Sequence, residues 1–152
     1  MQGNATLSPQ GDRLNLEIVS NPMAVRAGLS VLLAAPLFAP ICSADRGTAE
    51  IVLAEAMNNI VEHAYAKKPG TICLTLSIEG DKLLCQIEDH GLPMPGETMP
   101  LGKLRDFDGR DDLPEGGFGW HLIRTLSHDL SYERRDLFNL LRFRLDARQS
   151  EP

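Results

Sequence analysis

The chain has 152 residues, a formal net charge of −6 and 43% hydrophobic residues. This length is typical of one domain with its own core, and a charged fraction of 24% is near the globular average, which argues against a wholly disordered chain. The negative balance argues against binding to duplex nucleic acid, which requires clustered Lys and Arg to neutralise phosphates.

The cysteines and the apolar stretches indicate a reducing location and no membrane segment. Cys42, Cys73 and Cys85 are an odd number without a C-x-x-C spacing, so we expect neither a zinc site nor a disulfide framework. A cytoplasmic location is the simplest interpretation. The longest uncharged apolar stretch, Leu29 to Ser43, contains two prolines and is shorter than the ~20 residues that a membrane helix needs.

The first patterned segment predicts a strand followed by a helix. Apolar residues alternate with polar ones from Leu14 to Ile18, as in a half-buried strand. The segment Ser20-Asn21-Pro22 then provides the cap and first turn of a helix that runs to about Ala35.

A second, longer helix follows, with Ser43 or Asp45 as its cap and an end near Lys67. Residues 1–13 and 147–152 carry no comparable pattern. We therefore expect a flexible N-terminus, one domain over residues 14–146 and a short C-terminal tail.

The next segment predicts a hairpin whose register follows from its turn. If Gly80-Asp81 is a two-residue turn, every apolar residue of both strands lies on one face. The facing pairs are Ile78 with Leu83, Leu76 with Cys85, and Leu74 with Ile87. Asp89 then lies at the strand's end on the inner face, where a carboxylate is costly without a partner, so it is a candidate ligand group. The alternative is a frayed strand end with Asp89 in a turn.

A long polar loop with four prolines, from Pro93 to Gly116, follows the hairpin and predicts a lid, a binding loop or a disordered segment. A helix through Thr125 comes next, and then two strands near residues 129–134 and 139–146. This order of elements predicts an α+β two-layer sandwich, with helices on one face of a mixed, largely antiparallel sheet.

Two groups of residues suggest chemistry. The second helix carries polar residues at i, i+4 and i+8, namely Glu55, Asn59 and His63. They form a stripe that starts on the polar side of the helix and turns toward the border of the buried face as it reaches His63. A carboxylate and an amide there suit an ion or a nucleophile, although a solvated face is the commoner cause of such a pattern. Gly117 and Gly119 open the next helix, where free backbone N–H groups suit a phosphate, although helix entry or tight packing also explains such glycines.

Three motifs occur in order along the chain: Glu55-x-x-x-Asn59-x-x-x-His63-Ala64-Tyr65, Asp89-x-Gly91-x-Pro93, and Gly116-Gly117-Phe118-Gly119-Trp120-His121-Leu122. This set resembles the N, G1 and G2 boxes of the Bergerat ATP-binding fold shared by gyrase, Hsp90, histidine kinases and MutL. Within that superfamily it is most similar to the anti-sigma factor serine-protein kinases of bacterial partner-switching modules. The resemblance spans the chain from about residue 14 to residue 146.

The resemblance implies a role for each group. Asn59 would ligate a Mg²⁺ ion that bridges the ATP phosphates, and Glu55 would be the general base for an incoming serine hydroxyl. Asp89 would accept a hydrogen bond from the adenine amino group, and Gly91 would leave room for the ring. The remaining nucleotide-binding residues that the resemblance implies are His63, Pro93, Gly116, Gly117, Phe118, Gly119 and Leu122.

The resemblance also implies protein partners. Arg26 matches the place of an arginine that contacts both a sigma factor and its antagonist, although a solvated helix arginine is an equal alternative. The implied partners are an anti-anti-sigma protein of the STAS type, a sigma factor and a second copy of the chain, with neither nucleic acid nor membrane. Two alternatives are an ATP-binding module that sequesters a partner without phosphate transfer, and the ATP-binding domain of a histidine-kinase pathway. A lid cation would have to be Arg110, Arg105 or Lys103, because residues 113–116 contain no arginine.

Overall fold

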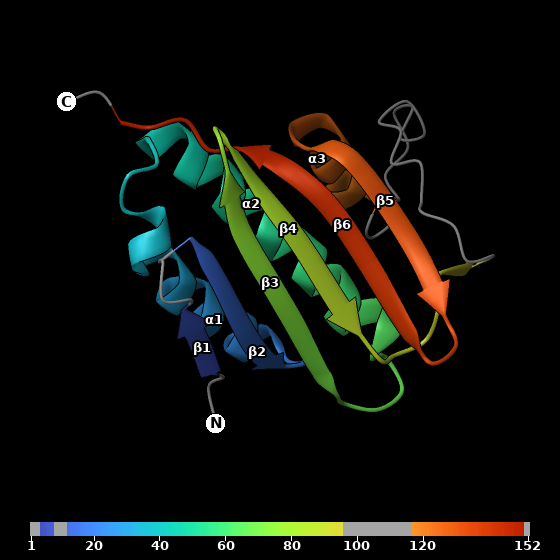
Figure 1. Ribbon diagram of the computed structural model, residues 1–152. Coiled ribbons are helices and arrows are strands. Elements are labelled where there is room, and N and C mark those ends of the chain that lie inside the picture. Colours follow the sequence, from blue (N-terminus) through green and yellow to red (C-terminus); the bar gives the residue numbers. More distant parts are fainter. Residues whose placement is uncertain (1–3, 8–11, 96–116, 151–152) are drawn as a thin grey trace.

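The computed structural model describes residues 4–7, 12–95 and 117–150. Six strands form one sheet in the order β1-β2-β3-β4-β6-β5, and three helices lie behind it (Figure 1). The strands are β1 (Asn4–Leu7), β2 (Arg13–Val19), β3 (Thr71–Glu79), β4 (Lys82–Asp89), β5 (His128–Arg135) and β6 (Phe138–Asp146). The helices are α1 (Pro22–Leu33), α2 (Ser43–Asn59) and α3 (Gly117–Leu126), with a 3-10 turn η1 (Pro36–Phe38) and a π-helical turn η2 (Ile60–Ala64).

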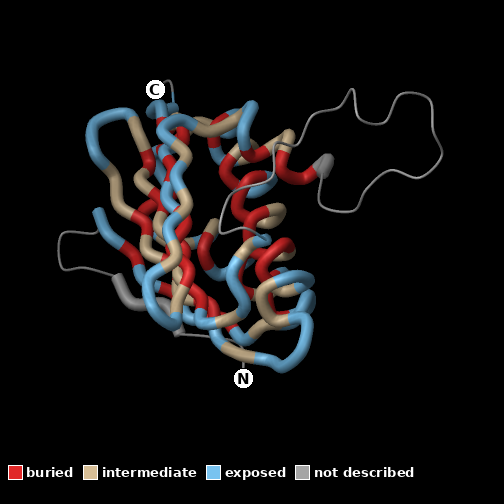
Figure 2. Tube along the Cα trace, turned by 90° about the vertical axis from the view of Figure 1, so that its right-hand side faces the viewer, coloured by how far each residue is buried: buried red, intermediate tan, exposed pale blue. Residues whose placement is uncertain are grey.

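The predicted α+β two-layer sandwich is confirmed. Figure 2 shows the sheet and the helices as two layers, with buried residues gathered between them. The core joins the inner side chains of the strands to the apolar faces of α1 and α2, and α3 packs against α2. All strand pairs in the described part of the chain are antiparallel, rather than mixed.

The start of α1 follows the predicted capping chemistry. Asn21 Oδ1 accepts a hydrogen bond from the backbone N–H of Ala24 at 2.8 Å, and Pro22 occupies the first helical position. The helix ends at Leu33, slightly before the predicted end. Gly28 lets the helix lie close to β2, because a Cβ atom at this position would be 2.6 Å from Ile18 Cδ1.

The second helix differs from the prediction at both ends. Its cap is Cys42, without a side-chain bond, so neither Ser43 nor Asp45 caps it. At its other end the α-helix stops at Asn59 and widens into η2, in which the Tyr65 N–H donates to the Ile60 carbonyl at 3.0 Å. The helical segment therefore ends at Ala64, close to the predicted end near Lys67, but its π turn was not predicted because apolar spacing does not distinguish α winding from one π turn.

The predicted β3–β4 register is confirmed at all three facing pairs. Gly80 adopts a left-handed φ of 64° in the turn, where a side chain would be strained. The strand continues to Asp89, which pairs with Ile72 and Asn139 and is only 3% exposed. The inward position of Asp89 is therefore confirmed, and the alternative of a frayed strand end is wrong.

Both ends of the chain contain structure that the sequence pattern did not predict. Strand β1, within the segment expected to be a flexible N-terminus, pairs antiparallel with β2. The expected C-terminal tail is also ordered: Ala147 is buried, and the Cys42 N–H donates to the Arg148 carbonyl at 2.7 Å. Arg148 also binds Asp45 through Nε (2.9 Å), Nη2 (2.8 Å) and its backbone N–H (2.8 Å). These contacts link segments about 100 residues apart, so local pattern could not reveal them.

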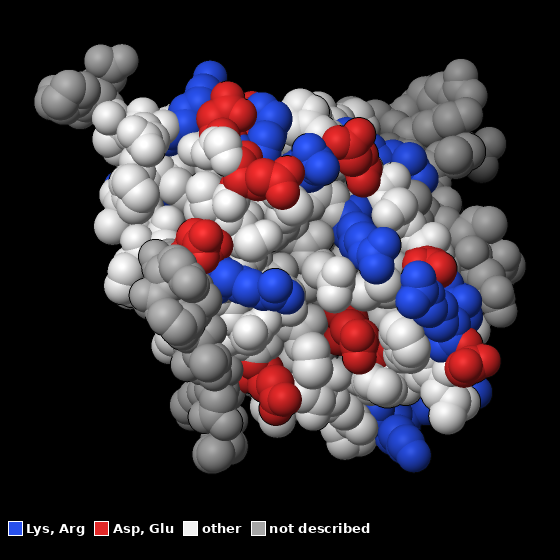
Figure 3. Space-filling view, viewed as in Figure 1, with Lys and Arg blue, Asp and Glu red and all other residues white. Residues whose placement is uncertain are grey.

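The face of the sheet away from the helices carries mixed charge. Figure 3 shows Lys and Arg side chains interspersed with Asp and Glu on this face. Such mixing does not produce the one-signed field that attracts a polyanion. No helix within the described residues is long and apolar enough to cross a membrane.

Candidate functional site

Buried polar side chains locate the site. In the part of the chain that the structure describes, four polar or charged residues are buried: Asp45, Asn59, Asp89 and Asn139. The first is paired with Arg148 and holds the C-terminal segment. The other three lie around the ends of α2 and β4 and the adjacent end of β6. Since burial of polar groups is costly, their accumulation at one end of the sandwich indicates a functional site.

The carboxylate of Asp89 is held from one side only. Its Oδ1 accepts hydrogen bonds from the Gly91 N–H at 2.9 Å and from Asn139 Nδ2 at 2.8 Å. Burial raises the pKa of Asp89 above its ordinary value, while these two bonds and the charge of Arg134 act in the opposite direction. Both described bonds end on Oδ1, so Oδ2 is left to accept a further N–H group.

The β5–β6 hairpin contributes Tyr132, Arg134 and Asn139 to this site, and the sequence analysis missed all three. Asn139 Nδ2 also donates to the Leu92 carbonyl at 2.9 Å, and Arg134 Nη1 donates to the Gly91 carbonyl at 2.7 Å. A signal existed in the sequence, because Asn139 is the one polar residue at the start of an otherwise apolar strand segment. Asn139 can be recognised as a partner of Asp89 only once β6 is paired with β4, and the sequence pattern does not give that pairing.

The loop after β4 is joined to the end of η2. The Leu92 N–H donates to the Ala64 carbonyl at 2.8 Å, and a Cβ atom at Gly91 would overlap that same carbonyl group. The Tyr65 hydroxyl accepts from the His90 N–H at 2.8 Å and donates to the Thr71 carbonyl at 2.7 Å. Close backbone approach is therefore a sufficient reason for glycine at position 91.

Glu55 and Asn59 face the start of α3. A Cβ atom at Gly119 would lie 2.5 Å from Glu55 Oε1 and 3.6 Å from Asn59 Nδ2, so only glycine fits there without displacing Glu55. Asn59 is 8% exposed, and its Nδ2 has no hydrogen-bond partner among the described residues. A buried amide without a partner costs free energy in the empty protein, which points to a ligand that uses it.

The other predicted site residues are placed less centrally. His63 is exposed in η2, 3.9 Å from the Glu62 carboxylate, rather than turned toward the buried border, because the π turn changes the helical rotation after Asn59. Pro93 is exposed and Leu122 is half-buried in α3. Gly117 and Phe118 belong to the first turn of α3, while Gly116, the lid cations and most of the predicted lid (residues 96–116) lie outside the described residues.

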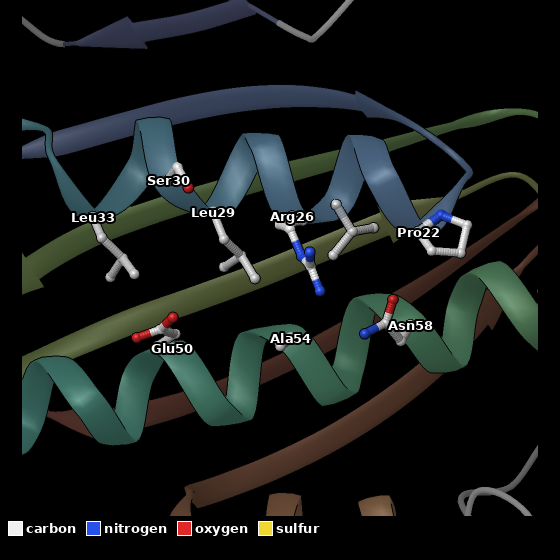
Figure 4. Close-up of a pocket in the computed structure, with 9 residues that line it drawn as sticks. Pro22, Arg26, Leu29, Ser30, Leu33, Glu50, Ala54 and Asn58 are labelled. Carbon is white, nitrogen blue, oxygen red and sulfur yellow. The ribbon is translucent and has the colours of Figure 1, made fainter.

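A separate groove lies between α1 and α2 (Figure 4). Its volume is about 340 Å³, and Leu29 and Leu33 project from α1 toward α2. The Arg26 side chain extends into it from α1, and Glu50 extends from α2 near Leu33. The remaining lining residues are Pro22, Val25, Ser30, Ala54 and Asn58.

The fold is an α+β sandwich, and its site combines a buried carboxylate at the end of β4 with a helix, α3, that opens with glycines and packs against α2. The chain belongs to the histidine kinase-like ATPase domain family, whose sequence model matches residues 18–145. The resemblance drawn from the three boxes is thereby confirmed.

The chain is also similar in sequence to bacterial proteins named as serine-protein kinases. The chain is 37% identical over 100 residues to serine/threonine-protein kinase BtrW of Bordetella bronchiseptica, covering 63% of this chain and 67% of that protein. It is 33% identical over 89 residues to serine-protein kinase RsbW of Bacillus mycoides, covering 57% of this chain and 55% of that protein. The matched region thus spans between about half and two thirds of these relatives.

Solved structures of histidine kinases are also similar. The histidine kinase AdeS of Acinetobacter baumannii matches with a TM-score of 0.43 and 16% identity, over 67% of this chain and 47% of that one. The blue-light activated histidine kinase EL346 of Erythrobacter litoralis matches with a TM-score of 0.46 and 14% identity, over 83% of this chain and 60% of that one.

Proposed function

We propose that this chain is an ATP-dependent protein-serine kinase that phosphorylates an anti-anti-sigma protein of the STAS type and sequesters a sigma factor. The observation that carries the proposal is the approach of Asn59 and Glu55 to Gly119 at the start of α3, together with the buried carboxylate of Asp89 at the end of β4. Membership of an ATPase-domain family, and relatives named serine-protein kinases, support it.

Nucleotide binding follows from the two ends of the site. Asp89 Oδ2 accepts a hydrogen bond from the adenine amino group, while Gly91 keeps the loop against η2 and leaves space beside the carboxylate. Gly117 and Gly119 bring backbone N–H groups of the first turn of α3 close to the phosphates. A helix N-terminus suits this role because its N–H groups are unpaired and its dipole favours negative charge.

The residues present fit a magnesium ion. Within the described residues no cluster of three or more His, Cys, Asp or Glu side chains could hold a metal without help. Mg²⁺ in nucleotide sites usually has only one or two protein ligands, with phosphates and water completing its shell. The Oδ1 atom of Asn59 would supply such a ligand, and its unpartnered Nδ2 would donate to a phosphate oxygen. A magnesium ion held there would supply charge neutralisation at the phosphates.

Glu55 is the proposed general base. It is half-buried one helical turn before Asn59, and it has no hydrogen bond or ion pair with the described residues. Its carboxylate accepts the proton of a serine hydroxyl as the serine oxygen bonds to the γ-phosphorus. The bond from that phosphorus to the β–γ bridging oxygen breaks, and ADP leaves with the electron pair.

Arg26 and the groove beside it are the proposed partner surface. Arg26 is exposed on α1 and extends into a groove with an apolar floor and an acid, Glu50, farther along. Such a combination suits a protein segment that offers a carboxylate next to apolar side chains. Met23 and Val31, which are exposed on the same helix, favour the proposed contact with a second copy of the chain. Light scattering on the purified protein tests the expected dimeric mass.

Transfer of label from γ-labelled ATP tests the kinase. Wild type, Glu55→Gln and the exposed control Glu62→Gln are incubated with Mg²⁺ and a lysate of the source organism. We expect a small serine-phosphorylated protein with wild type and with Glu62→Gln, and none with Glu55→Gln, although all three bind ATP. If wild type binds ATP but labels no protein, the proposed kinase activity is wrong. That result would favour the alternative of an ATP-binding module that sequesters a partner without phosphate transfer.

A further inference from the structure

Three side chains of the β5–β6 hairpin form a network beside the Asp89 carboxylate. Asn139, only 4% exposed, lies directly opposite Asp89 in the β4–β6 pairing. It donates through Nδ2 to Asp89 Oδ1 at 2.8 Å and to the Leu92 carbonyl at 2.9 Å. The amide of Asn139 therefore joins the carboxylate to the loop that follows it.

Two further donors determine which way the Asn139 amide points. The Tyr132 hydroxyl donates to Asn139 Oδ1 at 2.5 Å, and Arg134 Nη1 donates to the same oxygen at 3.2 Å. A flipped amide would place its oxygen against the Asp89 carboxylate and its nitrogen against the Arg134 guanidinium. Because Oδ1 is held by two donors, the NH₂ group must face Asp89.

We propose that Asn139 is a positioning residue that keeps Asp89 a hydrogen-bond acceptor, so that the site selects a base with an amino group over one with a carbonyl oxygen at that position. The proposal rests on the nucleotide-binding function proposed above. An ionised carboxylate only accepts hydrogen bonds, so it repels a carbonyl oxygen. A protonated carboxyl donates through its O–H and loses this discrimination.

The surrounding charges give the direction of the pH effect. Burial raises the pKa of Asp89, and Asn139, Gly91, Arg134 and His90 all act to lower it. Tyr65, which also faces Asp89, has a pKa raised mainly by burial and stays neutral. Removal of the Asn139 amide takes away a donor that favours the charged carboxylate. Protonation of Asp89, and with it loss of discrimination, then begins at a higher pH than in wild type.

Binding of Mg-ATP and Mg-ITP, measured by calorimetry from mildly acidic to mildly alkaline pH, tests this proposal. The two nucleotides share the same triphosphate, so the ratio of their dissociation constants removes the titration of the phosphates. We expect wild type and the exposed control Asn15→Ala to prefer ATP. In Asn139→Ala, ATP binding weakens about tenfold or more, ITP binding changes less, and the preference disappears at a higher pH. Tyr132→Phe shows a smaller change in the same direction.

The outcomes separate the two proposals. If wild type binds neither nucleotide, the proposed function is wrong. If wild type prefers ATP, and both Asn139→Ala and Tyr132→Phe keep its ratio and its pH dependence, the positioning role is wrong and the proposed function stands. Should Asn139→Ala fail to fold, Tyr132→Phe decides, because it removes one hydroxyl and leaves the ring in place.

Discussion

The buried side chains of Asn59 and Asn139 differ in their hydrogen bonding, and substitution of each by alanine tests whether Asn59 is kept for a ligand and Asn139 for structure. Asn59 Nδ2 has no partner in the described part of the chain. The Asn139 side chain makes four hydrogen bonds, donating to Asp89 and Leu92 and accepting from Tyr132 and Arg134. The same change of side chain should therefore alter stability in opposite directions.

The magnitudes follow from these contacts. Asn59→Ala removes a buried orphan group and improves helix propensity, each worth about 0.5–1 kcal/mol, against a small loss of packing. We expect a net gain of about 1 kcal/mol in the free energy of unfolding, or a rise in Tm of roughly 2–4 °C for a chain of this size. Asn139→Ala leaves Asp89 without one of its two described donors, and we expect a loss of roughly 2–4 kcal/mol.

Thermal unfolding without nucleotide, followed by the same measurement with saturating Mg-ATP, checks both variants. A ligand that binds only the folded state raises Tm, so the shift reports binding. Asn59→Ala should start from a higher Tm than wild type and gain little from Mg-ATP. A fall in the stability of the empty Asn59→Ala protein, comparable to that of Asn139→Ala, would refute the reasoning that Asn59 is kept for a ligand.

Two further substitutions, each with a control variant, test contacts between segments distant in the sequence. Arg148→Ala should lower the free energy of unfolding at neutral pH, by less than a buried ion pair would because the Arg148 side chain is 63% exposed. Arg46→Ala, whose side chain has no ion pair or hydrogen bond with the described residues, should be nearly neutral in urea unfolding. Arg148 holds the pKa of Asp45 far below its usual range in the folded protein. The stability that the pair contributes is therefore fully present above the pKa of an unfolded Asp and is lost as pH falls through the pKa of folded Asp45. A stability difference between wild type and Arg148→Ala that persists in strong acid would contradict this account. Gly91→Ala should weaken ATP binding in calorimetry and cost roughly 1–3 kcal/mol, because its Cβ overlaps the backbone of η2. Gly47→Ala, in open space within α2, should stabilise by about 0.5–1 kcal/mol, and similar effects of the two substitutions would refute this account.

The parts of the fold that were predictable depend on local pattern. The β3–β4 hairpin has a strict period of two on both strands and a two-residue turn, so its register, and the inward position of Asp89, followed from pairing alone. Helix α1 was predictable from the Asn21 cap and Pro22. In each case the information lies within a few residues along the chain, or across one short turn.

The parts that were missed depend on contacts between distant segments. Asn139 binds Asp89 across 50 positions, and Arg148 binds Asp45 across 103. A single polar residue in an apolar strand does not reveal its partner until the strand order is known. The π turn after Asn59 is a different case, because its hydrogen bond from Tyr65 to Ile60 is local but requires no distinctive residue type. This turn placed His63 on the exposed side, contrary to the predicted stripe.

The two layers of the fold divide the proposed work of the site between them. The sheet layer holds the acceptor for the base, since Asp89 is at the end of β4 and is bonded to β6 through Asn139. The helix layer holds Glu55 and Asn59 opposite the first turn of α3. The contact between Gly91 and η2 connects the layers directly at the site. An unsatisfied group persists only where the surrounding structure holds it in place. The hydrogen bonds of Asn139 hold Asp89 in position, whereas the Nδ2 atom of Asn59 has no such partner among the described residues. We therefore expect base recognition to survive Glu55→Gln, a change in the helix layer that abolishes transfer.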